Sequence, residues 1–441
     1  MNESSPTPLL DLRGVGQSYP AAESGVRVKI LEDINLAVHE GEIVAILGRS
    51  GCGKSTLLRI MCGLIEPSAG TVLYRGTPVT GPAAGISMVF QSFALFPWLT
   101  VLQNVTLGLE ARGVEEGERN RRADEVIEMI GLSGYESAYP KELSGGMRQR
   151  VGFARALVVD PDVLLMDEAF SALDVPTAES LRADLLDLWS ERLIPTQAIV
   201  MVSHSIEEAL FLADRVLVFD SNPGRVKDEV RVTLKHPRDR ESASFRALVE
   251  RIYGIMTTAA AGSAGGAVHG GRVGLAYRLP EVSVAQVSGV LEQLDQSGDH
   301  GGAELSELAE EMHLDLDTLF AIVEALELLG LAHVAERRIR MTRVGKVFVD
   351  GDQQQRRRIF AEHLVRRVPL VAHILRVLDE RPQRRAPEER FLRELEDRLS
   401  EQESERVLSV VIQWARYAEL LDYDYDAGVL SMGSPDVQQG A

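Results

Sequence analysis

The chain has 441 residues, a formal net charge of −19 and a hydrophobic fraction of 45%. This length predicts two or three domains, and the apolar content excludes a largely disordered protein. The acidity disfavours a nonspecific nucleic-acid coat or direct binding to an anionic membrane surface. The two cysteines, Cys52 and Cys62, fit a reduced cytosolic compartment better than a disulfide framework.

Short apolar runs alternate with helical patterns as far as about residue 235. They lie at residues 43–47, 86–90, 163–166, 198–202 and 216–219. The alternation predicts an α/β domain with a mainly parallel sheet that is covered on both faces. Between residues 92 and 159 the pattern is mostly helical, which predicts an inserted helical subdomain.

The composition changes near the middle of the chain. A helix is expected over 242–256, and the small residues at 259–267 then predict a flexible linker. The remainder is predominantly helical. The predicted divisions are a domain at 8–257, a linker at 258–275, a second domain at 276–432 and a tail at 433–441. The start of the chain lacks the features of a signal peptide, and no apolar run reaches the about 18 residues that span a bilayer.

Residues 48–55 read GRSGCGKS and directly follow the first apolar run. A strand, a glycine loop and a helix in this order direct backbone N–H groups and a helix N-terminus at one point, where an anion binds. The alternative, a glycine-rich turn that binds nothing, does not explain this context. The pattern predicts a nucleoside triphosphate site, with Lys54 reaching the β- and γ-phosphates and Ser55 ligating Mg²⁺. The predicted nucleotide-binding residues are Gly48, Ser50, Gly51, Cys52, Gly53, Lys54, Ser55 and Thr56.

The apolar run at 163–166 ends in two carboxylates, Asp167 and Glu168. The first would hold Mg²⁺, directly or through water, and the second would polarise the attacking water as general base. A strand that ends in Asp-Glu is by itself more often followed by a solvated loop. The phosphate loop upstream favours the catalytic interpretation.

Residues 143–150, LSGGMRQR, are the most diagnostic segment. Taken alone, they could be an ordinary helix start with Ser144 as N-cap. Their order and their spacing to Asp167 resemble the signature sequence of ATP-binding cassette (ABC) ATPases. Gln91 matches that family's glutamine loop, and His204 matches its switch histidine, although a histidine at a strand end is by itself more often a surface residue.

The resemblance covers residues 8–257 and implies a P-loop NTPase fold with a RecA-like core and an inserted helical subdomain. It implies ATP and Mg²⁺ as cofactors, catalytic roles for Glu168, His204 and Gln91, and a homodimer, because each ATP lies between the loop of one subunit and the signature of the other. The residues expected to hold Mg²⁺ are Ser55, Gln91 and Asp167. Those expected to contact the partner's ATP are Ser144, Gly145, Gly146 and, in the D-loop at 171–174, Asp174.

Three positions need separate comment. Tyr19 is the only aromatic residue before the phosphate loop, so it is the candidate for stacking on adenine; the alternative is a plain surface tyrosine. Ala169 stands where the family usually has proline, and Ser205 where it usually has aspartate. Neither change removes a group that touches the nucleotide, so hydrolysis is still expected.

The segments at 90–101, 166–174 and 211–216 look like the nitrate, sulfonate and taurine importer branch of the family. This implies uptake of a small anion such as nitrate, sulfonate, taurine or bicarbonate, with a membrane permease, an extracytoplasmic solute-binding protein and a place on the cytoplasmic face of a bacterial-type plasma membrane. Apolar side chains after Gln91 would line the groove for the permease, or simply pack the helical subdomain: Phe93, Leu95, Phe96 and Trp98.

The second domain carries no catalytic motif. Residues 303–312, 315–329 and 332–342 predict a helix, a helix and a wing, and a looser echo runs from 391 to 424 with its later helix at 409–421. The region resembles the AAA-associated C-terminal domain and is expected to be mainly α and winged-helix-like.

DNA binding through the second helix is the functional prediction that a winged helix invites. No Lys or Arg occurs between residues 279 and 336, so we expect no nucleic acid and a regulatory or dimer-stabilising role instead. The basic residues that follow would pair with the acidic block within or between chains. The competing hypotheses are a non-transport ABC ATPase and an ATP-dependent regulator.

Overall fold

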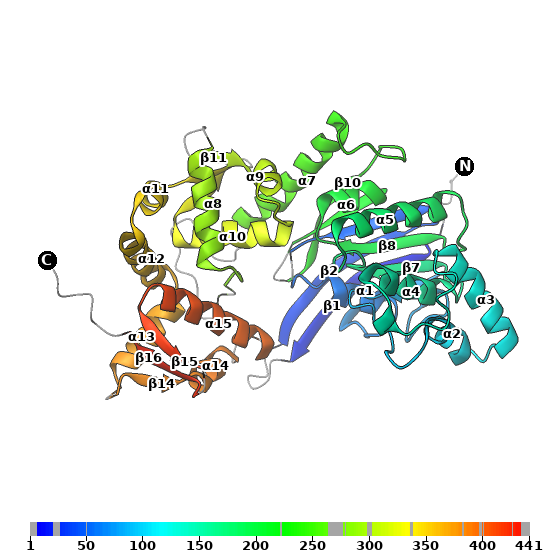
Figure 1. The fold of residues 1–441 in the computed structure, drawn as a ribbon, viewed down its shortest axis with the longest axis horizontal. Coiled ribbons are helices and arrows are strands. Elements are labelled where there is room, and N and C mark those ends of the chain that lie inside the picture. The colour runs from blue at the N-terminus through cyan, green and yellow to red at the C-terminus, as the bar shows by residue number, and fades with distance from the viewer. Residues whose placement is uncertain are drawn as a thin grey trace. The chain divides into compact units, whose positions relative to one another are not determined.

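The structure is a computed structural model, and its described part divides into two compact units (Figure 1). The N-terminal unit comprises Met1–Gln17 and Lys29–Ile252, and the C-terminal unit comprises Ser18–Val28 and Tyr253–Ala441. The described residues are 7–20, 27–49, 51–220, 223–262, 277, 279–297, 302–335, 338–381, 383–396, 399, 401–425 and 427–433.

A six-stranded sheet in the order β10-β9-β3-β8-β7-β6 forms the centre of the N-terminal unit. The five predicted strands are confirmed, and they pair in parallel, while β10 pairs antiparallel to β9. Every residue of β7 and β8 is buried, as expected for strands covered on both faces. The strands are β3 (Glu42–Leu47), β6 (Ile86–Val89), β7 (Val163–Asp167), β8 (Ala198–Ser203), β9 (Arg215–Asp220) and β10 (Arg225–Arg231).

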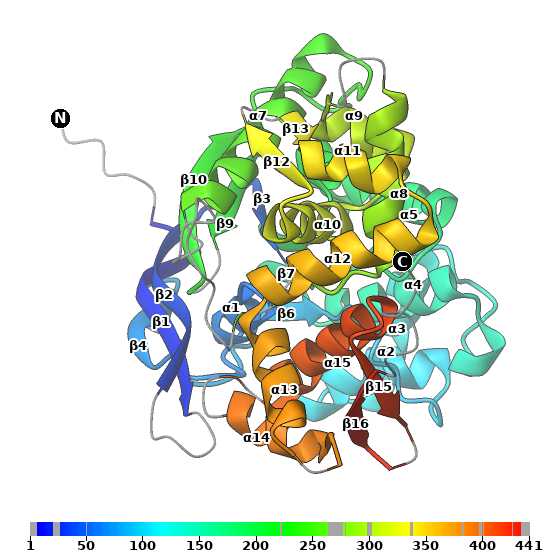
Figure 2. The ribbon, with the colours of Figure 1, turned by 90° about the vertical axis from the view of Figure 1, so that its left-hand side faces the viewer.

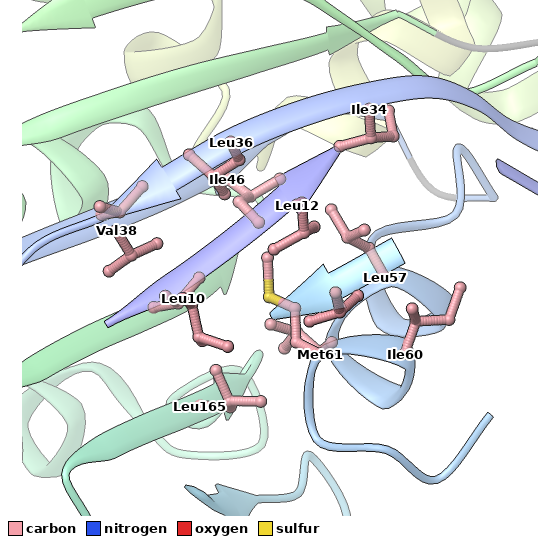
Figure 3. Close-up of a cluster of buried hydrophobic side chains, with 14 of the residues drawn as sticks. Leu10, Leu12, Ile34, Leu36, Val38, Ile46, Leu57, Ile60, Met61 and Leu165 are labelled. Atoms are coloured by element: carbon pink, nitrogen blue, oxygen red, sulfur yellow. The ribbon is translucent and has the colours of Figure 1, made fainter. Parts of the chain in front are cut away.

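A second sheet, in the order β2-β1-β4-β5, was not part of the sequence prediction. Its strands mix buried and exposed residues, so they lack the continuous apolar runs that reveal the central strands. Figure 3 shows the core on which it packs, a cluster of buried side chains that includes Leu10 of β1, Val38 of β2, Met61 of the first helix and Leu165 of β7. The elements are β1 (Leu10–Pro20), β2 (Arg27–Val38), β4 (Ala69–Tyr74), β5 (Thr77–Pro78) and α1 (Lys54–Met61).

The expected helical subdomain lies between β6 and β7 and has its own apolar core, which includes Val105, Ile127 and Val151. Its helices are α2 (Val101–Ala111), α3 (Glu116–Met129), the short 3₁₀ helix η1 (Pro140–Glu142) and α4 (Gly145–Leu157). Later helices are α5 (Val175–Ser190), α6 (Ile206–Leu212) and α7 (Ala243–Gly262). Helix α7 continues past the expected end at Met256 into the expected linker, and residues 263–276 lie outside the described part.

The C-terminal unit is mixed α/β rather than mainly α, because strands accompany its helices in two repeats of the same order. Each repeat runs helix, strand, helix, helix, strand, strand, and in each three-stranded sheet the last strand lies in the middle. The first repeat is α8 (Val284–Gln296), β11 (Gly302–Glu304), α9 (Leu305–Glu311), α10 (Leu316–Leu329), β12 (Ala332–Ala335) and β13 (Arg338–Met341). The second is α13 (Pro369–Asp379), β14 (Arg385–Pro387), α14 (Glu388–Glu396), α15 (Glu401–Tyr417), β15 (Leu421–Asp424) and β16 (Val429–Met432). The later helix of the second repeat was therefore misplaced at 409–421.

Two helices join the repeats, α11 (Arg343–Asp350) and α12 (Gln353–Arg367). On α12, Arg356 pairs with Glu292 of α8 at 2.6 Å, and the neighbouring Arg357 pairs with Glu419 just after α15. The predicted pairing of basic with acidic residues therefore occurs within the chain at Arg356.

Figure 2 shows α10 surrounded by α8, α12 and β12, and none of its described side chains from Thr318 to Leu329 is exposed.

Candidate functional site

The phosphate loop connects the buried strand β3 to helix α1 in a conformation that requires glycine. A Cβ at Gly48 would lie 2.9 Å from Cys52 Sγ and from Phe219 Cβ. Gly51 and Gly53 have φ values of 79° and 96°, which side chains rarely adopt. The loop therefore has the shape expected of a phosphate site, with Cys52 buried beneath it.

Lys54, the first residue of α1, lies folded back over this loop. Its ammonium donates hydrogen bonds to the carbonyl of Gly48 at 2.6 Å and to that of Arg49 at 3.2 Å, and the residue is only 4% exposed. Thr56 follows on the same helix turn. The predicted contact Ser50 lies outside the described residues.

Ser55 and Asp167 meet although 112 residues separate them. The Ser55 hydroxyl donates to Asp167 Oδ1 at 2.8 Å, because β3 and β7 lie on either side of β8 and end at the same edge of the parallel sheet. Asp167 is 5% exposed, and burial raises the pKa of its carboxyl group. A hydroxyl and a buried carboxylate next to a phosphate loop are ligand types that suit Mg²⁺.

Gln91, Glu168 and His204 follow β6, β7 and β8, and the structure brings all three together at this edge. The Gln91 amide donates to Glu168 Oε2 at 2.9 Å, and His204 Nδ1 lies 3.7 Å from the same oxygen. The polar interaction with the neighbouring His204 holds the pKa of Glu168 below its usual value. Glu168 has a φ of 47°, a strained conformation for a non-glycine residue.

The signature segment begins helix α4. The Ser144 hydroxyl accepts from the backbone N–H of Met147 at 3.3 Å, so it is the N-cap, and Asp174 caps α5 by accepting from Thr177. A Cβ at Gly146 would lie 2.3 Å from Thr177 Cγ2. Within the described part of the chain, no hydrogen bond or ion pair joins Ser144, Gly145, Gly146 or Asp174 to residues 48–55, so the structure does not bring this group to the phosphate loop of its own chain.

The three positions that needed separate comment in the sequence, Tyr19, Ser205 and Ala169, lie in different parts of the N-terminal fold or next to it. Tyr19 lies near the end of β1 and is 40% exposed, so its role toward adenine stays a prediction. Ser205 caps α6 by accepting from the N–H of Glu208 at 3.2 Å, which explains how serine serves there. Ala169 is buried.

Sequence reasoning missed a buried ion pair beside the site. Arg182 of α5 and Glu208 of α6 lie 3.5 Å apart, with side chains that are 11% and 10% exposed. Burial raises the pKa of Glu208 and lowers that of Arg182. The sequence feature that could have indicated this pair is Glu208 itself, a charged residue that lies on the short helix α6 among the apolar residues Ile206, Ala209 and Leu210.

Comparisons with known proteins give the family of each part of the chain. The family model for the ABC transporter matches residues 31–171, and the model for the C-terminal AAA-associated domain matches 306–424. An uncharacterized ABC transporter ATP-binding protein of Methanocaldococcus jannaschii is 48% identical over 233 residues, which are 53% of this chain and 86% of that protein.

Two further relatives carry transport names. The nitrate import ATP-binding protein of Synechocystis sp. is 47% identical over 219 residues, 50% of this chain and 80% of that protein. The taurine import ATP-binding protein of Burkholderia thailandensis is 47% identical over 196 residues, 44% of this chain and 74% of that protein. A solved post-hydrolysis dimer of an ATP-binding cassette with ADP and Pi is 33% identical, has a TM-score of 0.46, and matches 51% of this chain and all of that one.

The N-terminal unit is thus an ABC ATPase domain, an enzyme that binds and hydrolyses ATP. The chain belongs to the ABC transporter ATP-binding proteins and also carries a C-terminal AAA-associated domain. No helix in its described residues is long and apolar enough to cross a membrane.

Proposed function

We propose that this chain is the ATP-hydrolysing subunit of an importer for a small anion such as nitrate, sulfonate, taurine or bicarbonate. The observation that carries the hydrolytic part is the meeting of Gln91, Glu168 and His204 at the sheet edge that also holds Ser55 and Asp167. The names of the nitrate and taurine import relatives support the choice of substrate class.

Each residue has a distinct task in this proposal. The loop N–H groups and Lys54 would bind the phosphates, and Ser55, Asp167 and Gln91 would hold Mg²⁺, which would neutralise charge on the phosphate oxygens. Glu168 accepts the proton of the attacking water, and His204 orients Glu168 from the next strand end. The Ser55–Asp167 contact fits a magnesium site completed by the nucleotide itself.

A dimer completes each site in this proposal. Because Ser144, Gly145, Gly146 and Asp174 make no polar contact with residues 48–55 in the described structure, they are available to a nucleotide bound by a second copy. The N-terminus of α4 offers backbone N–H groups to an anion, the same chemistry as the phosphate loop.

The glutamine loop, residues 91–99, supplies the candidate contact with a permease. Phe96 and Trp98 are 42% and 68% exposed, and their rings pack together with centroids 5.4 Å apart. Leu95 instead packs against the core of the helical subdomain, and Phe93 lies under Arg148. Of the four predicted residues, Phe96 and Trp98 therefore remain as candidates for the permease groove. Binding of a permease there would hold the chain at the cytoplasmic face of the membrane, and the permease would in turn receive the solute from an extracytoplasmic solute-binding protein.

The C-terminal unit is proposed as a regulatory or dimer-stabilising domain of two winged-helix-like repeats. The helix order supports this description, and the enclosure of α10 disfavours DNA reading by that helix. An electrophoretic shift with duplex DNA at physiological salt would test the point. A tight shift would favour the ATP-dependent regulator instead.

Glu168→Gln tests the hydrolytic mechanism. We expect ATP binding to persist, turnover to fall at least about 100-fold, and an ATP-bound dimer to accumulate in size-exclusion chromatography. Glu207→Gln, which changes an exposed glutamate on α6, is the matched control and should behave as the unmodified protein. Normal turnover by Glu168→Gln would refute the assigned base.

The importer part has a separate test. The tagged chain is isolated from gently solubilised membranes of its native host, and its companions are identified. A permease and its binding protein would support import, whereas a homodimer without membrane partners would favour the non-transport alternative.

A further inference from the structure

The glutamine loop contains two successive strained residues. Phe93 and Ala94 have φ values of 56° and 48°, in the left-handed region that favours glycine. The N–H of Ala94 also donates to the carbonyl of Ser92 at 2.5 Å, which closes a very tight turn. Such conformations persist only where the surrounding structure holds them.

Helix α4 supplies the residues that hold this turn. Arg155 donates from Nη1 to the Ala94 carbonyl at 2.5 Å and from Nη2 to the Phe93 carbonyl at 3.0 Å. Arg148 lies over the Phe93 ring at 5.4 Å, and a Cβ at Gly152 would lie 3.6 Å from the Phe93 carbonyl oxygen. Residues 148, 152 and 155 share one face of the helix because they are four and three positions apart.

Arg155 is suited to this task by shape and by environment. A guanidinium offers two N–H groups in one plane to two acceptors, which a lysine cannot do. Arg155 is half-buried, and burial lowers its pKa. No ion pair to it is present among the described residues, so the two loop carbonyls are its main polar partners.

The contact joins two parts of the candidate site. Helix α4 begins at the N-cap Ser144, and the loop begins at Gln91, whose amide donates to Glu168. We propose that Arg155 is a positioning residue: it fastens the glutamine loop to α4, so that Gln91 stays within hydrogen-bonding distance of Glu168 and moves only together with the helix that starts at Ser144. This inference rests on the proposed hydrolytic function.

The test compares Arg155→Lys with Arg112→Lys in the full chain. Arg112 is a matched control, because it also donates to two backbone carbonyls, those of Val159 at 2.8 Å and Ala84 at 2.6 Å. We expect both variants to bind ATP with the affinity of the unmodified protein and to show similar decreases in melting temperature. Only Arg155→Lys should lower kcat, by at least tenfold at unchanged KM, and its amides at 92–96 should exchange hydrogen at least tenfold faster.

A rescue variant separates positioning from general damage. Ala94→Gly lets the turn adopt its left-handed conformation without strain, so adding it to Arg155→Lys should restore at least part of kcat. Equal kcat in Arg155→Lys and Arg112→Lys, or unchanged exchange at 92–96, would overturn the proposal. If the unmodified chain hydrolyses no ATP, the proposed function fails, while the exchange comparison still decides whether Arg155 holds the loop.

Discussion

Thr177 occupies the space next to Gly146 where a side chain would begin. Because the Cβ of Gly146→Ala would lie 2.3 Å from Thr177 Cγ2, the start of α4 would have to move away from α5. We expect this substitution to cost about 1–3 kcal/mol of unfolding free energy, measured by urea titration. Gly145→Ala is the control, since its nearest neighbour would be 3.9 Å away.

Thr177→Ser provides the matching rescue. Serine keeps the hydroxyl that bonds Asp174 but lacks the methyl group that meets the new Cβ. The double variant should therefore recover most of the lost stability. A double variant as unstable as Gly146→Ala would show that the steric explanation is wrong.

A residue of the C-terminal unit gives a pH-dependent prediction. The hydroxyl of Tyr423 donates to Glu388 Oε2 at 2.5 Å, and this bond raises the pKa of Tyr423 to about 12. Because the folded pKa is raised, the contribution to stability is complete below the unfolded value of about 10 and is lost as pH rises through about 12. The absorbance difference between the unmodified chain and Tyr423→Phe should show phenolate forming near pH 12. In Glu388→Gln that transition should move toward pH 10; no movement would contradict the assignment.

At the scale of elements, the buried pair Arg182–Glu208 connects α5, whose N-cap is Asp174, to α6, which follows His204. Arg182→Met leaves a buried carboxylate without its partner, so we expect a loss of about 3–5 kcal/mol. Replacing both residues with methionine should return the stability to within about 1 kcal/mol, because no buried charge remains. Chemical denaturation of the single and double variants measures both values. Additive losses in the double variant would show that the pair does not interact.

Elements also show what the sequence can predict. The strands at the centre of the first unit contain continuous apolar runs, and parallel pairing then places Gln91, Asp167 and His204 at one edge. The strands β1 and β2 escape prediction because their buried residues are interspersed with exposed ones. Strands of three or four residues, such as β11 and β14, are too short to show a period. The two hydrogen bonds from Arg155 to the carbonyls of Phe93 and Ala94 cannot be predicted from residue types, because every residue has a backbone carbonyl.

At the scale of the molecule, the two compact units predict separable folding. A fragment ending at Gly262, the last residue of α7, keeps the whole N-terminal unit together with residues 18–28 and 253–262 of the other unit. It should fold cooperatively and bind ATP with the affinity of the full chain, because the candidate phosphate loop and sheet edge belong to the N-terminal unit. Circular dichroism melting and fluorescent-nucleotide titration check this. Global unfolding of the fragment would place the domain boundary elsewhere.

The adjacent residues Arg356 and Arg357 on α12 point to different repeats, one to Glu292 and the other to Glu419. Successive residues of a helix are about 100° apart around its axis. Helix α12 therefore fixes the angle between the two repeats, because each of these adjacent arginines binds a different repeat. One extra residue inserted between these arginines would turn one repeat by a further 100° while leaving each repeat internally intact. The number of residues in α12 therefore determines how the two repeats are arranged, whereas the apolar core of each repeat determines only its own fold.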